Sequence, residues 1–394
     1  MNYRENQKNG DMLSILGYGC MRFSRKGTGI DKEKTEREIL AAIEAGVNYF
    51  DTAYIYPGSE ALLGDILKRN GLRDKVKIAD KLPHYLIRKP EDIDRYFNEQ
   101  LARLQTDHID YYLMHFLTTA ETWQRLCSIG IDSWLERKKA EGAIRNVGFS
   151  FHGDTGNFNR IIDSYSWDMC QIQFNYMDER TQAGIDGLNH AHEKGIPVVI
   201  MEPLRGGKLA DKLPAAAKQE FAKADPSRTP VEWALRWLWD HEQVNVVLSG
   251  MNDICQVTEN CRIASQARAN EMTEEDLEVF RRVLAAINNN IKVGCTGCGY
   301  CQPCPQGVAI PSIFSIYNES FGESGYINAL IEYTKSTAMG QTSSNAGRCI
   351  GCGKCEQHCP QGLHIREELK NAAKRFETPL YRIGSKVLLK FFKQ

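Results

Sequence analysis

Eight cysteines near the C-terminal end stand at spacings that suit iron–sulfur chemistry. They lie in two runs, CTGCGYCQPCP at 295–305 and CIGCGKCEQHCP at 349–360. Three thiols at two-residue intervals can be presented by one tight loop to three corners of a cubane cluster. The glycines between them let the backbone wrap closely around such a group. The spacing therefore predicts cluster ligands, with zinc, which usually takes pairs of C-x2-C rather than triples, as the alternative.

The second run, C-x2-C-x2-C-x3-C-P, resembles the cysteine run of two-[4Fe-4S] bacterial ferredoxins, in which the fourth cysteine ligates the other cluster. The first run departs from this pattern, because two residues rather than three precede its fourth cysteine. The resemblance implies two ligand sets. One contains Cys295, Cys298, Cys301 and Cys359, and the other contains Cys349, Cys352, Cys355 and Cys304. The five isolated cysteines are expected to be structural thiols: Cys20, Cys127, Cys170, Cys255 and Cys261.

The composition is that of an ordinary globular protein. The 394 residues are 42% hydrophobic and 25% charged, with a formal net charge of -1, which gives no bias toward nucleic acid. The polar start shows no secretory signal, and no stretch approaches the roughly 20 apolar residues of a transmembrane segment. Clustered cysteines without a signal peptide predict a reducing, cytoplasmic setting in which thiols bind metal.

The leading part of the chain alternates short apolar runs with helical patterns. This rhythm is typical of parallel strands with helical crossovers, and eight units over about 250 residues predict a closed (β/α)8 TIM barrel. An open doubly wound sheet is the alternative. A two-residue turn at Asn9-Gly10 predicts a hairpin on the barrel floor. The expected strands are 13–19, 48–53, 75–81, 109–115, 146–150, 169–174, 197–201 and 244–250. The expected helices are 32–46, 59–71, 90–104, 123–142, 156–165, 183–195, 230–240 and 253–264.

Four polar residues stand at or just after the ends of consecutive expected strands, where TIM barrels carry their chemistry. Asp51 ends the second strand and Tyr56 follows in its loop, whereas Lys81 and His115 end the third and fourth strands. Tyr, with an ordinary pKa near 10, is a poor acid at neutral pH. A nearby ammonium would lower that pKa, and a carboxylate would hold the ammonium in place. The four types therefore form a coherent acid–base set.

The segments around these residues resemble the aldo-keto reductase family: FDTAYIYPGSE (50–60), IADK (78–81), DHIDYYLMH (107–115) and GFS (148–150). The resemblance covers about residues 1–285. It implies that Tyr56 is the general acid for a carbonyl oxygen, that Lys81 tunes it, and that Asp51 anchors Lys81. It further implies that His115 orients the carbonyl or assists proton transfer, and that a nicotinamide supplies hydride at the barrel mouth.

The same resemblance implies the cofactor-binding residues. Ser150 and Gln171 match residues that hold the nicotinamide carboxamide, and Glu259 and Asn260 match an adenine-contacting pair. The loop expected to cross the pyrophosphate contains Pro203, Leu204, Arg205, Gly206 and Gly207.

Several positions depart from the family pattern. Met201 stands where many members stack an aromatic ring on the nicotinamide, and 249–256 lacks the Lys or Arg that often binds the 2′-phosphate of NADP. Arg205 lies nearby in sequence. NADH, NADPH and a bound flavin therefore all remain open. Trp123, Tyr54 and Phe151 are expected either to line the substrate pocket or to pack in the core.

The overall expectation is an α/β protein, a TIM barrel followed by a small, mostly helical ferredoxin-like domain. The expected boundaries are 1–285 for the barrel, 286–376 for the dicluster domain and 377–394 for an amphipathic tail. The predicted activity interconverts a small-molecule carbonyl and an alcohol with NADH or NADPH. Iron–sulfur clusters pass single electrons whereas nicotinamide passes a hydride, so the two [4Fe-4S] clusters would serve a redox partner or a flavin. The alternatives are an ordinary reductase with structural clusters, and an electron-transfer protein.

Overall fold

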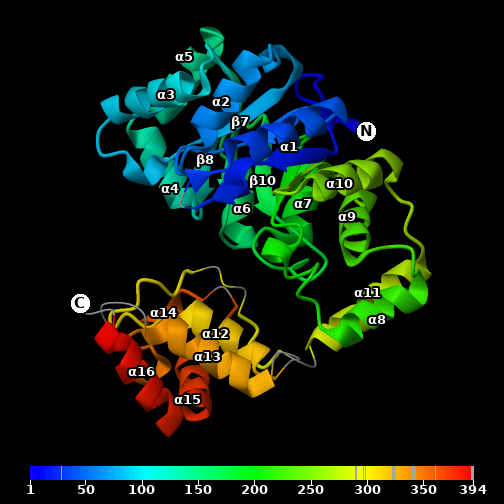
Figure 1. The fold of residues 1–394 in the computed structure, drawn as a ribbon. Helices are drawn as coiled ribbons and strands as arrows, with labels where there is room; N and C mark the ends of the chain where they lie inside the picture. Colours follow the sequence, from blue (N-terminus) through cyan, green and yellow to red (C-terminus); the bar gives the residue numbers. More distant parts are fainter. Residues whose placement is uncertain are drawn as a thin grey trace. The chain divides into compact units, whose positions relative to one another are not determined.

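The computed structural model describes residues 1–27, 29–288, 291–295, 297, 299–321, 325–338, 343–359 and 361–391, with side chains to residue 385. The chain divides into two compact units (Figure 1). The first contains Met1–Asp211 and Arg228–Glu274, and the second contains Lys212–Ser227 and Glu275–Gln394. Each unit is described by itself below.

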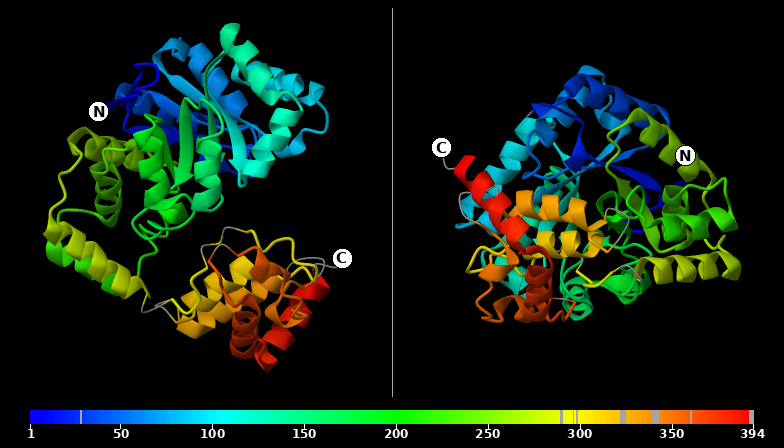
Figure 2. Two further views of the ribbon diagram at one scale, coloured as in Figure 1. Left: turned by 180° about the vertical axis from the view of Figure 1, so that it is seen from behind. Right: turned by 60° about the horizontal axis from the view of Figure 1, so that its bottom comes forward.

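The first unit is built on a closed barrel of parallel strands, which confirms the predicted TIM barrel (Figure 2). The order around the barrel is β10-β11-β12-β3-β6-β7-β8-β9, so neighbours in sequence are neighbours in the barrel. The strands are β3 (Leu16–Gly19), β6 (Tyr49–Asp51), β7 (Lys77–Leu82), β8 (Ile109–Leu117), β9 (Ile144–Phe151), β10 (Met169–Gln173), β11 (Val198–Met201) and β12 (Val244–Ser249).

Helices cover the outside of the barrel wall. The expected helix 123–142 is two helices, because Gly130 adopts a left-handed φ of 85° between them. The other helices begin and end close to their predicted positions. The set is α1 (Lys32–Glu44), α2 (Ser59–Arg69), α3 (Glu91–Leu104), α4 (Ala120–Ser128), α5 (Ile131–Ala140), α6 (Thr155–Ile162), α7 (Gly184–Glu193), α9 (Pro230–Asp240) and α10 (Ile254–Gln266).

A hairpin precedes the barrel, but its turn is longer than the sequence predicted. Strand β1 (Tyr3–Glu5) pairs antiparallel with β2 (Met12–Ser14). The backbone N–H of Asn6 donates to Asp11 O at 2.8 Å, so four residues rather than two form the loop. Gly10 supplies the left-handed conformation there, with φ 77°. A second, short hairpin joins β4 (Arg25–Lys26) to β5 (Gly29–Ile30).

The barrel interior is a packed apolar core rather than a channel. Alternate residues of the strands point inward. Met201, at the end of β11, packs against this core and is partly buried. The interior residues are Leu13, Tyr49, Ala79, Tyr111, Leu113, Met169, Val199, Val246 and Leu248.

The second unit contains two helices that the sequence analysis did not predict. Helix α8 (Ala215–Ala224) and helix α11 (Glu274–Asn288) contact each other through Phe221 and Phe280, whose ring centroids are 5.6 Å apart. Arg282 also forms an ion pair with Glu220 at 3.1 Å. The predicted domain boundaries remain predictions.

The rest of the second unit is helical, as predicted, around its own apolar core. Its helices are α12 (Ile310–Glu319), α13 (Gly325–Ala338), α14 (Lys354–Gln357), α15 (Ile365–Phe376) and α16 (Pro379–Phe391). Tyr333 and Phe376 stack in the core with ring centroids 4.6 Å apart, and Tyr381 of α16 packs against Tyr333. The start of the predicted C-terminal tail therefore packs against α13.

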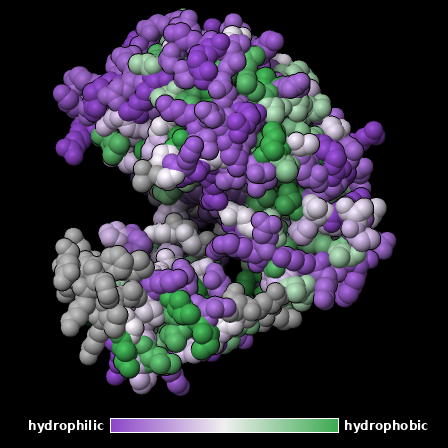
Figure 3. All heavy atoms as spheres, viewed as in Figure 1, coloured by the Kyte–Doolittle hydropathy of each residue, from purple (hydrophilic) through white to green (hydrophobic). Residues whose placement is uncertain are grey.

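Apolar side chains are exposed on part of the C-terminal unit. Figure 3 shows that polar side chains dominate the outer surface of the barrel's helices, whereas apolar side chains gather on part of the C-terminal unit. The exposed apolar residues of that unit include Ile327, Ile331, Leu380 and Ile383. Within the described ranges, no helix combines the length and apolar character needed to cross a membrane.

Candidate active site and cluster cavities

The four predicted acid–base residues come together at the C-terminal ends of three adjacent strands. Asp51 is the last residue of β6, Lys81 the next-to-last of β7, and His115 lies two residues before the end of β8. Tyr56 lies in the loop between β6 and α2. Because β6, β7 and β8 are parallel neighbours, their ends meet at the same mouth of the barrel.

Lys81 and Asp51 form a buried ion pair. The Lys81 Nζ atom lies 2.6 Å from Asp51 Oδ1 and donates a second hydrogen bond to Thr52 O at 2.7 Å. Burial, the largest single cause, lowers the pKa of Lys81, but the charge and hydrogen bond of Asp51 together with Tyr56 and Asp80 outweigh it, and the pKa is raised. Burial raises the pKa of Asp51, and Lys81 opposes that shift. Lys81 therefore stays charged and fixed in position.

Tyr56 lies beside this ammonium. The Lys81 Nζ atom is 5.4 Å from the centroid of the Tyr56 ring. As expected, the ammonium lowers the pKa of Tyr56, but the net shift of that pKa is upward. Burial raises the pKa of Tyr56, and Lys81 only reduces the shift. The phenol is therefore protonated at neutral pH, which is the form that donates a proton.

His115 faces Tyr56 edge-on, with ring centroids 6.2 Å apart at an interplanar angle of 87°. Burial, followed by the charge of Lys81, lowers the pKa of His115 to about 2. Its Nδ1 atom is buried without a hydrogen-bond partner. His115 is therefore a neutral imidazole that can offer a hydrogen bond but carries no charge.

Two more histidines surround His115, and their pKa values are also low. His84 and His152 both contribute to the lowered pKa of His115. Burial lowers the pKa of each to about 4. The barrel mouth therefore contains three neutral imidazoles, and Lys81 supplies the positive charge beside Tyr56.

Ser150 and Gln171 lie side by side, since they are paired in register on β9 and β10. Both are buried. Ser150 Oγ accepts the backbone N–H of Phe116 at 2.9 Å, which leaves its hydroxyl hydrogen free to donate. Gln171 Oε1 is buried without a partner. One donor and one open acceptor, paired across adjacent strands, fit a carboxamide, which offers an oxygen and an NH2 group.

The expected pyrophosphate loop follows β11. Gly206 and Gly207 have φ values of 68° and 90° within the short helix η4 (Arg205–Gly207), a conformation that favours glycine. Arg205, however, is engaged elsewhere, since its Nε lies 3.0 Å from Asp178 Oδ2. Two exposed cations lie beside the loop, namely Lys208, which follows η4, and Arg22, whose Nη1 donates to Gly206 O at 3.4 Å. The sequence analysis missed Arg22, although it follows a barrel strand by only three residues.

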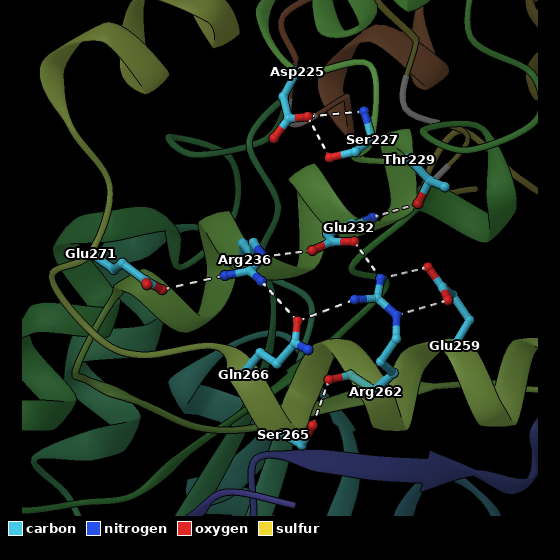
Figure 4. Close-up of polar contacts among 10 residues, drawn as sticks. All are labelled: Asp225, Ser227, Thr229, Glu232, Arg236, Glu259, Arg262, Ser265, Gln266 and Glu271. Carbon is cyan, nitrogen blue, oxygen red and sulfur yellow. Dashed lines mark hydrogen bonds and ion pairs between the residues drawn. The ribbon is translucent and has the colours of Figure 1, made fainter.

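Glu259 and Asn260 lie next to each other on α10. The Glu259 carboxylate is bound by Arg262 at 2.9 and 3.1 Å, within a network that reaches α9 (Figure 4). In that network Arg262 also contacts Glu232 of α9 at 2.6 Å. Asn260 is buried and donates from Nδ2 to Ser249 Oγ at 3.2 Å, which ties α10 to the end of β12.

The larger cavity of the second unit, about 180 Å³, is lined by one of the two predicted ligand sets. Cys304, Cys349, Cys352 and Cys355 all contribute to its wall. Gly351 and Gly353 between the thiols have φ values of 72° and 74°, as a tight loop around a cluster requires. The cavity therefore groups Cys304 with the second cysteine run.

The smaller cavity, about 20 Å³, is lined by three members of the other set, Cys295, Cys301 and Cys359. Cys301 also borders the larger cavity, so the two sites adjoin. The fourth predicted ligand, Cys298, lies outside the described residues. Among the residues that the structure does describe, no three His, Cys, Asp or Glu side chains group closely enough to hold a single metal ion. The donor set, with thiols from both runs at each cavity, fits two thiolate-bound clusters.

Comparison with known families now identifies the barrel. The family model described as "Aldo/keto reductase family" matches residues 15–281, more than half of the chain. The chain belongs to the aldo/keto reductase family. A second model, described as "4Fe-4S dicluster domain", matches residues 294–364 of this aldo-keto reductase. The predicted fusion of the two is confirmed.

Relatives of this aldo-keto reductase match its barrel. The uncharacterized oxidoreductase YqkF of Bacillus subtilis is 25% identical over 304 residues, which cover 68% of this chain and 92% of that protein. L-galactose dehydrogenase of Arabidopsis thaliana is 24% identical over 301 residues, covering 70% and 92%. The holo form of aldo-keto reductase AKR11C1 from Bacillus halodurans superimposes with a TM-score of 0.59 at 25% identity, covering 72% and 96%. These matches give no support to a bound flavin.

The three aromatic residues considered in the sequence take the packing alternative in this aldo-keto reductase. Trp123 and Phe151 are buried among other aromatic rings, and Tyr54 packs on Tyr96 with its hydroxyl bonded to Glu99. The exposed rings near the acid–base set are instead Tyr85, 6.2 Å from the ring of His115, and Phe116, which is 39% exposed.

Proposed function

We propose that this chain interconverts a small-molecule carbonyl and an alcohol, using a nicotinamide cofactor. The observation that carries the proposal is the buried ion pair of Lys81 and Asp51 beside Tyr56, at the mouth of the barrel. Membership of an oxidoreductase family gives independent support.

The proposed roles follow from the charge states. The bound nicotinamide supplies the hydride. The Tyr56 hydroxyl donates a proton to the carbonyl oxygen, and the Lys81 ammonium stabilises the phenolate that this leaves. Asp51 holds Lys81 in place. His115 donates a hydrogen bond to the carbonyl oxygen, because a neutral imidazole can orient the oxygen without competing as an acid.

The proposed cofactor contacts are Ser150 and Gln171 for the carboxamide and the glycines of the η4 loop for the pyrophosphate. Backbone N–H groups at positive φ approach phosphate closely. We assign Arg22 the role of an anion contact at this loop, because Arg205 is bound to Asp178. The proposal covers both NADH and NADPH.

For the second unit we propose two [4Fe-4S] clusters with the ligand sets predicted from the sequence. The thiol-lined cavities support this grouping. Iron–sulfur clusters exchange single electrons, so we propose that they serve a redox partner rather than the nicotinamide directly. The second candidate is a structural role, favoured by the way in which both cysteine runs close around one small helical core.

The proposal is tested by adding NADH or NADPH to the anaerobically purified full chain with a panel of aldehydes and ketones. We expect oxidation of the nucleotide to depend on the carbonyl, with one alcohol formed per nucleotide. Nucleotide oxidation without alcohol, or no turnover across the panel, would contradict the carbonyl reductase. Potentiometric electron paramagnetic resonance on the same sample separates redox-active clusters from structural ones.

A further inference from the structure

Two carboxyl groups lie behind the acid–base residues, on the outer side of the barrel wall. Asp80 directly precedes Lys81 on β7, and successive strand residues point to opposite faces. Lys81 points to Asp51, so Asp80 points toward the helices α2 and α3, which lie side by side there (Figure 1). Glu60, on the first turn of α2, meets it. Both residues are buried, with 0% and 2% of their surface exposed.

Each of these carboxyls has one bonded oxygen and one oxygen without a partner. Asp80 Oδ1 accepts the backbone N–H of Lys81 at 2.8 Å, and Glu60 Oε2 binds Arg103 Nη1 at 2.7 Å. Asp80 Oδ2 and Glu60 Oε1 are buried, and as two ionised carboxylates they would have no hydrogen-bond donor. A hydrogen bond with the Glu60 side chain is one of the causes that raise the pKa of Asp80. A single proton shared by the two carboxyls would satisfy both open oxygens.

The surrounding charges indicate which carboxyl carries the proton. Arg103, from α3, forms an ion pair with Glu60, so we assign the proton to Asp80. The side chain of Lys81 points to the inner face of β7, where its ammonium binds Asp51 and Thr52 O, whereas Asp80 points to the outer face. With Asp80 protonated, these buried groups are neutral overall. The carboxylate of Asp51 is paired with Lys81, and the carboxylate of Glu60 is paired with Arg103.

The other titratable groups that face Asp80 do not supply a positive charge. They are Tyr112 of β8, Tyr56 of the loop after β6, and Cys20 after β3. Burial raises the pKa of each of these groups, so all three are neutral. Burial, followed by repulsion from Glu60, likewise raises the pKa of Asp80 well above its ordinary value.

Close packing keeps water from the carboxyl pair. A side chain at Gly64, one turn after Glu60 on α2, would lie 2.4 Å from the backbone of Leu104 at the end of α3, so the two helices approach closely here. Gln100 of α3 is fully buried between Tyr112, whose hydroxyl it accepts at 2.7 Å, and the backbone carbonyl of Lys81.

We propose that Asp80 remains a protonated carboxylic acid that donates a hydrogen bond to Glu60, and that this neutral acid positions Lys81 for the reaction. Asp80 holds the N–H of Lys81 while Gln100 holds its carbonyl at 3.1 Å, so the backbone of Lys81 is fixed on both sides. A charged Asp80 would add a second carboxylate that competes with Asp51 for the ammonium. Only the benefit to Lys81 rests on the proposed function; the protonation of Asp80 does not.

The first test is the pH dependence of unfolding of the full chain and of Asp80→Asn. All six tryptophans lie in the barrel unit, so tryptophan fluorescence reports its unfolding. A raised pKa in the fold means that the folded wild type retains a proton that the unfolded chain loses above about pH 4. The wild type therefore loses stability relative to Asp80→Asn as the pH rises. We therefore compare the unfolding equilibrium constant of the wild type with that of Asp80→Asn. Between pH 5 and 7 we expect the ratio of the wild-type constant to the variant constant to rise about tenfold per pH unit.

The second test is spectroscopic. The carbonyl stretch of a protonated carboxylic acid should be present in the infrared spectrum of the wild type at pH 7 and absent from Asp80→Asn. The proposal would be overturned if the unfolding constants of the wild type and of Asp80→Asn changed equally with pH and the wild type showed no such band. A wild type that gains stability relative to Asp80→Asn as the pH rises would do the same, because Asp80 would then be ionised in the fold.

The positioning role needs a separate comparison. The amide of Asp80→Asn can accept from the Lys81 N–H and donate to Glu60, so we expect kcat within about threefold of the wild type. Asp80→Leu has a side chain of similar size that can bond neither to the Lys81 N–H nor to Glu60. For this variant we expect a large loss of kcat with little change in nucleotide affinity. Equal kcat in both variants would overturn the positioning role. Absence of carbonyl turnover in the wild type would refute the proposed function, while the unfolding and infrared tests would still decide the protonation.

Discussion

Lys81 Nζ lies 2.6 Å from Asp51 Oδ1, and both side chains are almost completely buried. Removing one member of such a pair leaves a buried charge without compensation, which costs about 3–5 kcal/mol. We therefore expect Asp51→Ala to lower the free energy of unfolding of the barrel unit by about 3–5 kcal/mol, measured by denaturant titration. The double variant Asp51→Ala/Lys81→Met should recover much of this loss, because no buried charge remains. Equal losses in both variants would contradict a compensated ion pair.

The pKa directions predict a simple pH profile for carbonyl reduction. His115, with a pKa of about 2, stays neutral, and Tyr56, with a raised pKa, stays protonated. The kcat for reduction should therefore be flat from roughly pH 5 to 9 and fall only as the phenol ionises at higher pH. The measurement is kcat at saturating nucleotide across this range. A transition near pH 6–7 would mean that a histidine titrates in the working enzyme.

Arg22 is predicted to bind the anionic part of the nucleotide. Replacing it by Gln should weaken nucleotide binding about tenfold, or about 1.4 kcal/mol, and should reduce the dependence of Kd on salt. Lys26→Gln is the matched control, since it removes an exposed charge four residues away. The nucleotide Kd of each variant is measured by titration of the intrinsic fluorescence. A similar loss in the two variants would indicate a general charge effect rather than a contact.

The cluster assignment predicts the iron content of two cysteine variants. Cys352 lines the larger cavity, whereas Cys255 is an exposed cysteine of α10 in the barrel unit. Because each cluster carries half of the iron, Cys352→Ser should lose about half of the iron per chain. Cys255→Ser should lose none. Iron analysis of anaerobically purified protein decides this, and full iron in Cys352→Ser would refute the ligand set.

The barrel could be predicted from the sequence because each strand-and-helix unit is encoded locally by its apolar pattern. The positions of Asp51, Lys81 and His115 at strand ends followed directly from that alternation. The sequence-based predictions that were wrong concern properties that depend on contacts between distant segments. The pKa of Tyr56 is decided by burial, which the sequence does not display, and Arg205 is bound to Asp178 rather than free for phosphate.

Other features were missed for similar reasons. Helices α8 and α11 pair through Phe221 and Phe280, which lie 59 residues apart, so no local pattern marked them as partners. Phe116 follows the expected strand 109–115 directly, but nothing in the sequence indicated its φ of 64° at an irregularity of β8, near His115. The Asp80–Glu60 pair was hidden because each residue alone resembles a solvated carboxylate.

The central claim is that Tyr56 protonates the carbonyl oxygen, and the most direct measurement compares Tyr56→Phe with Tyr54→Phe. Tyr54 is a matched control, since it lies two residues earlier in the same loop and its hydroxyl bonds to Glu99 at 2.7 Å. General acid catalysis contributes about 10²–10⁴-fold. We predict that Tyr56→Phe loses at least about 100-fold in kcat for carbonyl reduction while nucleotide affinity and iron content stay unchanged, and that Tyr54→Phe keeps wild-type kcat. Wild-type turnover by Tyr56→Phe would contradict the account.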